Sequence, residues 1–289
     1  MEAFSFTGLG TKWSVLVDAE SFQKELKHSI LCYVEDFENR FSRFLPQSEV
    51  NAFRESSAGE YSVSREFLQF LTIADRLRIL TNGVYDPAVA TLLENAGYGA
   101  KENIRSLAER ENTHLPVWSL SGDKLVIDGP IAFDLGGIGK GYCIDRVAEI
   151  VRSFGCEYFL VDGGGDMVAT MKADGSPYRI AVEYPGKLDT AASLINLSNQ
   201  GLAVSDSFRR RFGKWHHLID VQKKKPVEQV IGCAALAENA WMADCMTSGL
   251  FFAPVTKYPL LTREFNAEYL VFQSDGTTFV SAGWSGELL

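Results

Sequence analysis

The sequence predicts a single α+β domain in which mixed or antiparallel β-sheets pack against several helices. Some segments carry apolar side chains at every second position, which is typical of strands. Residues 20–40, 64–81 and 240–252 carry them three and four positions apart, which is typical of amphipathic helices. A length of 289 residues suits one large domain or two small ones. No internal repeat or low-complexity linker divides the chain, so we expect residues 1–289 to form one domain.

The first half of the chain is predicted to hold an opening strand pair, two helices and two short strands. Residues 3–18 alternate loosely between apolar and polar side chains, which indicates the strand pair. Residues 20–40 and 64–81 each place their apolar side chains on one side of a helix. The short apolar runs at residues 125–127 and 131–133 are interpreted as strands on either side of a turn.

The second half is predicted to be mainly β-structure with further helical segments. Residues 177–204 alternate clearly, and residues 230–237 form an apolar run of strand length. Residues 240–252 follow as a helix. Residues 266–284 are expected to close the domain as a β-hairpin around Asp275-Gly276.

Residues 133–166 contain the densest set of chemically informative side chains. An apolar strand signal runs into Asp134, and a glycine-rich turn follows, made of Gly136, Gly137, Gly139, Lys140 and Gly141. The one-sided apolar spacing after this turn predicts a helix that Gly155 ends. A short strand at residues 158–161 then leads into a second polar glycine turn at residues 162–166.

The first glycine turn suits a phosphate or pyrophosphate. Glycine lets the backbone approach a ligand and point its N–H groups at an anion, a helix N-terminus attracts phosphates, and Lys140 adds a full positive charge. It is neither a P-loop, because Asp134 and Gly141 hold two required positions, nor a Rossmann motif, because Tyr142 replaces the third glycine. One such turn would indicate an ordinary α/β connection. Two turns with three acids and a lysine favour a binding site.

Composition argues against several classes of protein. The net charge of −9 argues against nonspecific nucleic-acid binding, although a local basic cluster can still bind an anionic substrate. The five cysteines form no CxxC pair and are expected to be buried or free thiols in a reducing compartment. No apolar run approaches the roughly 20 residues of a membrane helix, and no secretory signal opens the chain. We therefore expect a cytoplasmic protein with no nucleic-acid or membrane partner.

The glycine-rich stretch carries a resemblance to a known family. The segment DLGGIGKGYCIDRVAEIV followed by LVDGGGD resembles the core signature of the ApbE family, the FAD:protein FMN transferases. Further motifs extend the resemblance from about residue 8 to residue 284, with residues 240–252 also among the best matches. The resemblance implies an ApbE-like, T-fold-related domain, FAD as the substrate, Mg²⁺ as the cofactor and an acceptor flavoprotein as the partner.

The resemblance also implies which residues contact FAD. They are Leu9, Phe44, Val84, Tyr85, Asp86, Asp134, Lys140 and Leu218. The family usually has Met at the position of Leu9, Tyr85 offers a ring for stacking, and Asp86 offers an acceptor for flavin N–H groups. The Gly97-Tyr98-Gly99 segment also fits the family. Without the family, we would interpret the short Leu9 motif as structural and Phe44 as a core residue, and Asp86 could simply begin a turn.

A further set of residues is expected to hold Mg²⁺. Residues four apart in a helix share a face, so Asp244 and Ser248 present hard oxygen ligands together, with Thr247 close by. The resemblance adds the backbone carbonyl of Gly137 as a ligand and gives Asp244 a catalytic role. Without the family, the same spacing would also fit a buried polar helix end.

The rest of the predicted site contains two histidines and two departures from the family. The resemblance places His217 rather than His216 in the family's histidine position, and His217 is the candidate general base because histidine pKa values can lie near neutrality. Asp206 stands where the family has glycine, and a proline and a glycine are missing after Asp220. The basic run Arg209–Arg211 is either a solvated surface or a contact for phosphate or partner.

Three functions remain open on the sequence alone. The first, favoured by the family, is Mg²⁺-dependent transfer of FMN from FAD to a Ser or Thr hydroxyl of an acceptor flavoprotein, which is protein flavinylation with AMP as the leaving group. The second is an FAD pyrophosphatase in which water replaces the acceptor hydroxyl. The third is a non-catalytic FAD-binding protein, which the lost turn residues suggest and which Asp244, Ser248 and Lys140 argue against.

Overall fold

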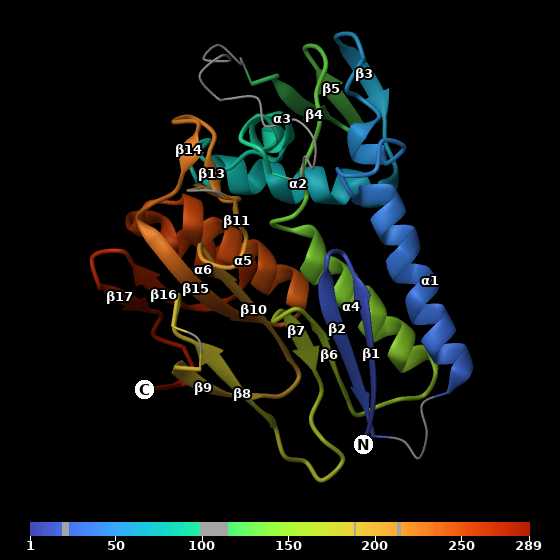
Figure 1. Ribbon diagram of the computed structural model, residues 1–289, viewed down its shortest axis with the longest axis vertical. Helices are drawn as coiled ribbons and strands as arrows, with labels where there is room; N and C mark the ends of the chain where they lie inside the picture. Colours follow the sequence, from blue (N-terminus) through green and yellow to red (C-terminus); the bar gives the residue numbers. More distant parts are fainter. Residues whose placement is uncertain (19–22, 99–114, 188, 213–214) are drawn as a thin grey trace.

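The computed structural model is built around one antiparallel sheet (Figure 1). It describes residues 1–18, 23–98, 115–187, 189–212 and 215–289. The strand order in the sheet is β1-β2-β6-β7-β10-β15-β16-β17, and each neighbouring pair is antiparallel. The strands are β1 (Glu2–Gly8), β2 (Thr11–Val17), β6 (Phe159–Gly163), β7 (Met167–Ala169), β10 (Gln200–Asp206), β15 (Val230–Ala237), β16 (Glu268–Gln273) and β17 (Thr278–Val280).

Smaller sheets lie around the central one. One contains β8 (Tyr178–Glu183), β9 (Ala191–Leu197) and β18 (Glu287–Leu288), and another contains β3 (Gly59–Ser62), β4 (Trp118–Ser121) and β5 (Lys124–Ile127). Two short ladders join β11 (Arg211–Phe212) to β12 (Trp215–His216) and β13 (Ile219–Asp220) to β14 (Lys225–Pro226). Val182 and Ile195 of the first small sheet share a buried apolar cluster with Leu160 and Leu202 of the central sheet.

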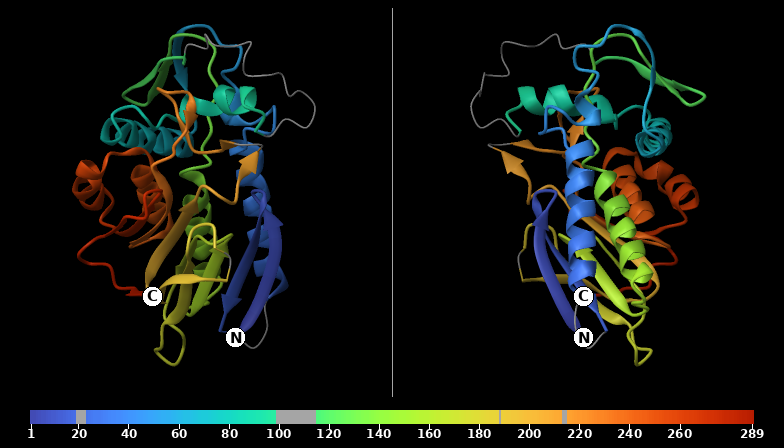
Figure 2. Two further views of the ribbon diagram at one scale, coloured as in Figure 1. Left: turned by 60° about the vertical axis from the view of Figure 1, so that its left-hand side comes forward. Right: turned by 90° about the vertical axis from the view of Figure 1, so that its right-hand side faces the viewer.

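Helices cover the face of the central sheet that lies opposite the β8–β9 sheet (Figure 2). They are α1 (Lys24–Phe41), α2 (Arg65–Leu80), α3 (Ala90–Asn95), α4 (Gly139–Ser153), α5 (Ala240–Phe252) and α6 (Tyr258–Phe265), with 3-10 turns η1 (Glu49–Asn51), η2 (Pro87–Val89) and η4 (Val255–Lys257). Helix α4 packs against α1, α5 and β6, and α5 packs against β10 and β15. None of the helices among the described residues is long and apolar enough to cross a membrane.

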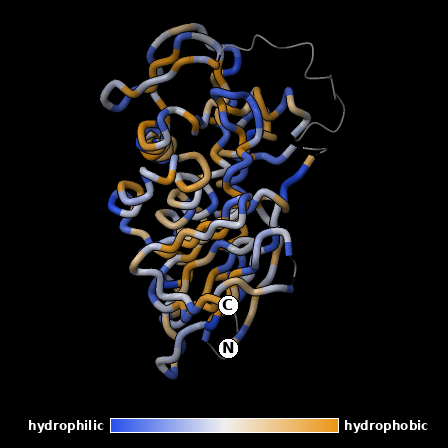
Figure 3. Tube along the Cα trace, turned by 90° about the vertical axis from the view of Figure 1, so that its left-hand side faces the viewer, coloured by the Kyte–Doolittle hydropathy of each residue, from blue (hydrophilic) through white to orange (hydrophobic). Residues whose placement is uncertain are grey.

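The hydrophobic pattern explains where the helices form. In α1 the buried residues Leu26, Ile30, Val34, Phe37 and Phe41 follow one another at intervals of four or three, so they share one face. Helix α5 is buried almost all round, and the side chain of Asn239 caps its start by accepting a hydrogen bond from the N–H of Met242. Hydrophobic stretches of the trace run through the strands and helices of the interior (Figure 3).

Most of the predicted elements are confirmed, and one is wrong. The opening strand pair is β1 and β2, residues 230–237 and 240–252 match β15 and α5, and the closing hairpin is β16 and β17. Residues 131–133 are not a strand. The N–H groups of Ile131 and Phe133 donate to the carbonyls of Phe53, in the turn after η1, and Val50, in η1 itself, so this apolar segment is buried without a strand beside it. Residues 20–22 and 99–114 lie outside the described part of the chain.

The turn after Asp220 keeps a hairpin despite its missing proline and glycine. The Asp220 carboxylate accepts hydrogen bonds from the N–H groups of Gln222 at 3.0 Å and Lys223 at 2.9 Å. Lys224 takes the position of the missing glycine with φ of 54°, in the left-handed region that costs a non-glycine residue about 1 kcal/mol. The turn is therefore built differently from the family's, with Lys224 strained in the place of the glycine.

The first turn of α4 lies directly against α5, and Gly141 permits this approach. A Cβ atom at Gly141 would stand 2.3 Å from the carbonyl oxygen of Ala240 and 2.8 Å from Cβ of Asp244. At Gly139, in the same turn, an added Cβ would meet nothing closer than 3.6 Å. Only Gly141 is therefore required by the packing of the two helices.

Replacing Gly141 by Ala is expected to destabilise the fold, because the methyl group must push α4 away from α5. Overpacking of this kind costs about 1–3 kcal/mol. The matched change Gly139→Ala is expected to be neutral or to stabilise by up to about 1 kcal/mol through helix propensity. Urea unfolding of both variants measures the difference, and equal free energies of unfolding would contradict the packing argument.

Candidate functional site

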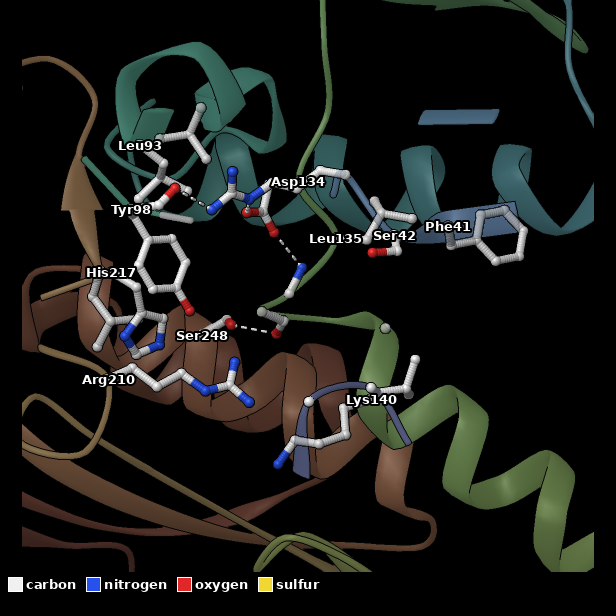
Figure 4. Close-up of a pocket in the computed structure, with 18 of the residues that line it drawn as sticks. Phe41, Ser42, Leu93, Tyr98, Asp134, Leu135, Lys140, Arg210, His217 and Ser248 are labelled. Atoms are coloured by element: carbon white, nitrogen blue, oxygen red, sulfur yellow. Dashed lines mark hydrogen bonds and ion pairs between the residues drawn. The ribbon is translucent and has the colours of Figure 1, made fainter. Parts of the chain in front are cut away.

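A cavity opens where the end of α1, the first glycine turn, α5 and the segment before β13 meet (Figure 4). Most of the residues predicted for the site line it. They are Leu9, Phe44, Tyr85, Asp86, Asp134, Gly137, Lys140, His217, Leu218 and Ser248. These residues come from distant parts of the chain, so the fold assembles a single site from the separate motifs.

Three predicted residues do not line the cavity. The carbonyl of Val84 accepts a hydrogen bond from the N–H of Val221 at 3.2 Å, so this residue holds the neighbouring hairpin. The Thr247 hydroxyl donates to the carbonyl of Asp244 at 2.9 Å and lies 3.1 Å from the Ser205 hydroxyl. Asp244 is also buried, behind the first turn of α4.

Two oxygen-bearing side chains of α5 contact the glycine turn four residues apart. The Ser248 hydroxyl donates to the carbonyl of Gly137 at 2.5 Å, and a carboxylate oxygen of Asp244 accepts from the N–H of Gly141 at 2.9 Å. Because Asp244 and Ser248 are four residues apart in α5, the two contacts lie about one helical turn apart. Three of the four predicted metal ligands, the oxygens of Gly137, Asp244 and Ser248, therefore lie along this contact.

The Asp244 carboxylate is short of positive charge. Burial, reinforced by the negative charge of Asp166, raises its pKa well above the usual range for aspartate. The ammonium of Lys140 forms an ion pair with Asp166, which is 1% exposed and also accepts from the N–H of Val204 at 2.9 Å. Two buried acids thus lie near one lysine, and the positive charges of Lys140 and Arg210 only partly offset the rise in the pKa of Asp244.

One side of the cavity, near the N-terminus of α4, carries positive charge. Figure 4 shows Lys140 and Arg210 on the same side of the cavity, below Ser248 in this view. Burial lowers the pKa of His217 to about 3, and the positive charge of Arg210 is the next largest cause. His217 is therefore a neutral imidazole at neutral pH, and its buried Nδ1 has no hydrogen-bond partner among the described residues. His216 instead contacts the Val227 carbonyl at 2.9 Å through Nε2, so its role is structural.

Aromatic rings form another wall. The ring of Tyr98 stacks on His217 with centroids 6.1 Å apart, and Phe44, which is 56% exposed, lies edge-on to Tyr98. Tyr85 is buried, and its hydroxyl has no hydrogen-bond partner in the described part of the chain. Leu9 lines the cavity from the hairpin turn between β1 and β2 at φ of 51°, a strained value for leucine. Such a wall suits a flat aromatic ligand.

Both predicted acids of the flavin motif already have protein partners. The Asp86 carboxylate caps η2 through the N–H of Ala88 and accepts from the indole of Trp118, each at 2.9 Å. Asp134 forms an ion pair with Arg43 at 2.6 Å and accepts from the N–H of Gly136 at 2.6 Å. Asp86 therefore has the turn role that its sequence motif also allowed, while still lining the cavity.

Sequence analysis missed several cavity residues or left them open. Arg43 lies directly before Phe44 in the same motif but was not singled out. Arg210 belongs to a basic run whose usual interpretation is a solvated surface, and only the fold places it at the cavity. Tyr98 was noted in a motif without a role, and Asp166 was counted only as one of three acids. Gly99 lies outside the described residues.

Comparison with known proteins connects this site to one family. The model of the ApbE family matches residues 9–271. The FAD:protein FMN transferase of Vibrio cholerae is 27% identical over 251 residues, covering 81% of this chain and 74% of that protein. The enzyme of the same name from Escherichia coli K12 is 26% identical over 294 residues, covering 94% and 84%.

Solved structures show the same architecture. The ApbE protein of Thermotoga maritima superimposes with a TM-score of 0.83 at 25% identity over 97% of both chains. The flavin transferase ApbE of Vibrio cholerae gives a TM-score of 0.82 at 24% identity, again over 97% of both chains. With the family match spanning most of the sequence and the predicted residues gathered in one cavity, the chain belongs to the ApbE family.

Proposed function

We propose that this protein is an Mg²⁺-dependent FAD:protein FMN transferase, which moves FMN from FAD to a Ser or Thr hydroxyl of an acceptor flavoprotein and releases AMP. One observation carries the proposal. The oxygens of Gly137, Asp244 and Ser248 all lie at the contact between α5 and the glycine turn that begins α4, beside a cavity with cationic and aromatic walls. The relatives named FAD:protein FMN transferase, which match most of the chain, support it.

The walls of the cavity fit the two chemistries of FAD. The aromatic and apolar side, with Leu9, Phe44 and Tyr98, suits the isoalloxazine ring, which stacks on flat or apolar surfaces. The cationic side contains Lys140, at the start of α4, and Arg210, from the segment before β11. It suits the pyrophosphate, because helix N–H groups and basic side chains both favour anions. FAD bound this way would hold its phosphates beside the α4–α5 contact.

The oxygen donors at this contact fit Mg²⁺. Mg²⁺ prefers oxygen ligands and takes one or two carboxylates together with phosphates. Asp244 would supply the carboxylate, Ser248 and the Gly137 carbonyl the neutral oxygens, and the raised pKa of Asp244 marks a carboxylate that a cation would stabilise. When bound, the ion would stabilise the negative charge that develops on phosphate oxygens.

The reaction that we propose exchanges one phosphorus–oxygen bond for another. The acceptor hydroxyl oxygen bonds to the phosphorus of the FMN half of FAD. The bond from that phosphorus to the bridging oxygen breaks, and the bridging oxygen leaves with AMP. Lys140 and Arg210 hold the phosphates in place, because positioning and charge neutralisation provide most of the rate in phosphoryl transfer. The hydroxyl proton must pass to a base.

His217 is the base that we propose. It is neutral, it lines the cavity, and its Nδ1 lacks a partner among the described residues, so it has a free site for a proton. The nearby positive charges of Arg210 and Lys140 contribute to its low pKa. An anionic pyrophosphate beside these two cations would offset them and strengthen His217 as a base when substrate is bound.

Replacing Asp244 by Asn is expected to lower Mg²⁺-dependent turnover of FAD by on the order of 100-fold or more, since charge stabilisation at the reacting phosphate is lost. The measurement is product formation across a Mg²⁺ titration. Asp145→Asn is the matched control, because Asp145 is a half-buried acid of the same helix pair that caps α5 by accepting from the N–H groups of Ala240 and Trp241. The control is expected to lose stability but keep its Mg²⁺ dependence. Full activity in Asp244→Asn would refute the metal assignment.

His217 is expected to stay neutral in the free protein from pH 8 to pH 5. Its folded pKa of about 3 lies below the ordinary 6.5, so the unfolded chain binds the extra proton and acidification below pH 6.5 destabilises the fold. His217→Gln removes this contribution, and its free energy of unfolding should fall less steeply between pH 6.5 and pH 4. Proton NMR checks this prediction, because the His217 signals are those of the wild type that are missing from the spectrum of His217→Gln. If those signals titrated near pH 6.5 in the wild type, the prediction would be wrong.

The proposed function is tested by incubating the protein with FAD, Mg²⁺ and an acceptor domain that carries a Ser or Thr flavinylation motif. Mass spectrometry then reads the products. An acceptor heavier by one FMN, together with free AMP, is expected. Free FMN and AMP without a modified acceptor would instead identify an FAD pyrophosphatase. Unchanged FAD in the presence of metal would identify a binding protein.

A further inference from the structure

Arg43 is a buried arginine two residues after the end of α1. Its side chain is 4% exposed, and its Nε lies 2.6 Å from a carboxylate oxygen of Asp134. Its Nη2 donates to the carbonyl of Tyr98 at 3.1 Å. The guanidinium also lies over the rings of Phe44 and Tyr98, 4.2 and 4.9 Å from their centroids. The guanidinium is therefore fixed by contacts on several sides.

Asp134 connects Arg43 to the glycine turn. Its second carboxylate oxygen accepts from the N–H of Gly136 at 2.6 Å, and its own N–H donates to the carbonyl of Pro87 at 2.7 Å. A Cβ atom at Gly136 would stand 2.8 Å from Oδ1 of Asp134, so a side chain there would displace the carboxylate from its present position. Arg43 thus fixes the rotamer of Asp134, and Asp134 fixes the backbone of the turn.

The next residue of the turn is Gly137, whose carbonyl faces Ser248 at the proposed metal site. We infer that Arg43 is a positioning residue that sets the orientation of the Gly137 carbonyl through Asp134 and Gly136, an inference that rests on the proposed function. Arg43 itself does not touch the metal ligands. Its contribution is the direction in which the carbonyl points.

The chemistry of arginine suits this role better than a role in stability. A buried ion pair contributes little net stability, because desolvation of the two charges offsets their attraction. A guanidinium is planar, so it can pair with Asp134, donate to Tyr98 and stack on rings at once, and lysine cannot reproduce that combination. The competing explanation is that Arg43 merely ties α1 to α3 through Glu94, which lies 3.7 Å away.

The test uses Mn²⁺ in place of Mg²⁺ and measures its binding by electron paramagnetic resonance. In Arg43→Met the Mn²⁺ affinity is expected to fall about 10–100-fold, as is typical when a residue behind a metal ligand is lost. The Mg²⁺ concentration that half-saturates turnover should rise in parallel. Asp134→Asn should have a similar effect, and the double variant should lose little more than either single variant, because both act along one path.

Arg54→Met is the matched control. Arg54 lies in the same loop region and pairs with Glu94 at 2.6 Å, but it does not line the cavity. It should lower stability without changing Mn²⁺ affinity. Equal losses in Arg43→Met and Arg54→Met, or an unchanged affinity in Arg43→Met, would overturn the inference. Should Arg43→Met fail to fold, Arg43→Lys replaces it, and wild-type Mn²⁺ affinity in that variant would overturn the inference as well.

Mn²⁺ binding needs no acceptor protein, so the two proposals fail separately. A wild-type protein that binds Mn²⁺ but transfers no FMN would refute the transferase and leave the Arg43 measurement intact. If the wild type bound no Mn²⁺ with or without FAD, the positioning role would be refuted, because there would be no metal site to position.

Discussion

The close contact between the first turn of α4 and helix α5 is the constraint on which the rest of the site depends. Gly141 allows it, since any side chain there would collide with the Ala240 carbonyl. The contact is held by the hydrogen bonds from Ser248 to Gly137 and from Gly141 to Asp244. The oxygens of Gly137, Asp244 and Ser248 in these bonds are also those proposed to hold Mg²⁺. The packing of the helices therefore sets the positions of the proposed ligands.

The charges around this contact decide which ligands the site suits. Lys140 is already paired with the buried Asp166, so it only partly offsets the charge of Asp244. Arg210 brings a second positive charge to the cavity, and His217 beside it is kept neutral. A buried acid whose charge is only partly offset thus lies near cations that can receive an anion. That combination suits a metal bound together with a pyrophosphate.

Departures from the family pattern are absorbed locally. Lys224 adopts the left-handed backbone of the glycine that it replaces, and Asp220 closes the turn by accepting two N–H groups. Asp206 accepts from the N–H groups of Phe208 and Arg209 and pairs with the Arg209 side chain, while Arg210 lines the cavity. Losing a family residue at a turn therefore changes which side chain closes the turn, not where the site lies.

The sequence by itself determined the α+β class and the helices whose apolar spacing is one-sided, because these depend on local periodicity. It also determined the motif residues, because these match the family's motifs position by position. It could not show that residues 131–133 bond to η1 and the turn after it, since a short apolar run looks the same with or without a neighbouring strand. Only the tertiary structure decided that Arg210 enters the cavity, that Ser248 rather than Thr247 faces Gly137, and that Arg43 pairs with Asp134. Such pairings join residues far apart in the chain, and they arise from packing that no local pattern records.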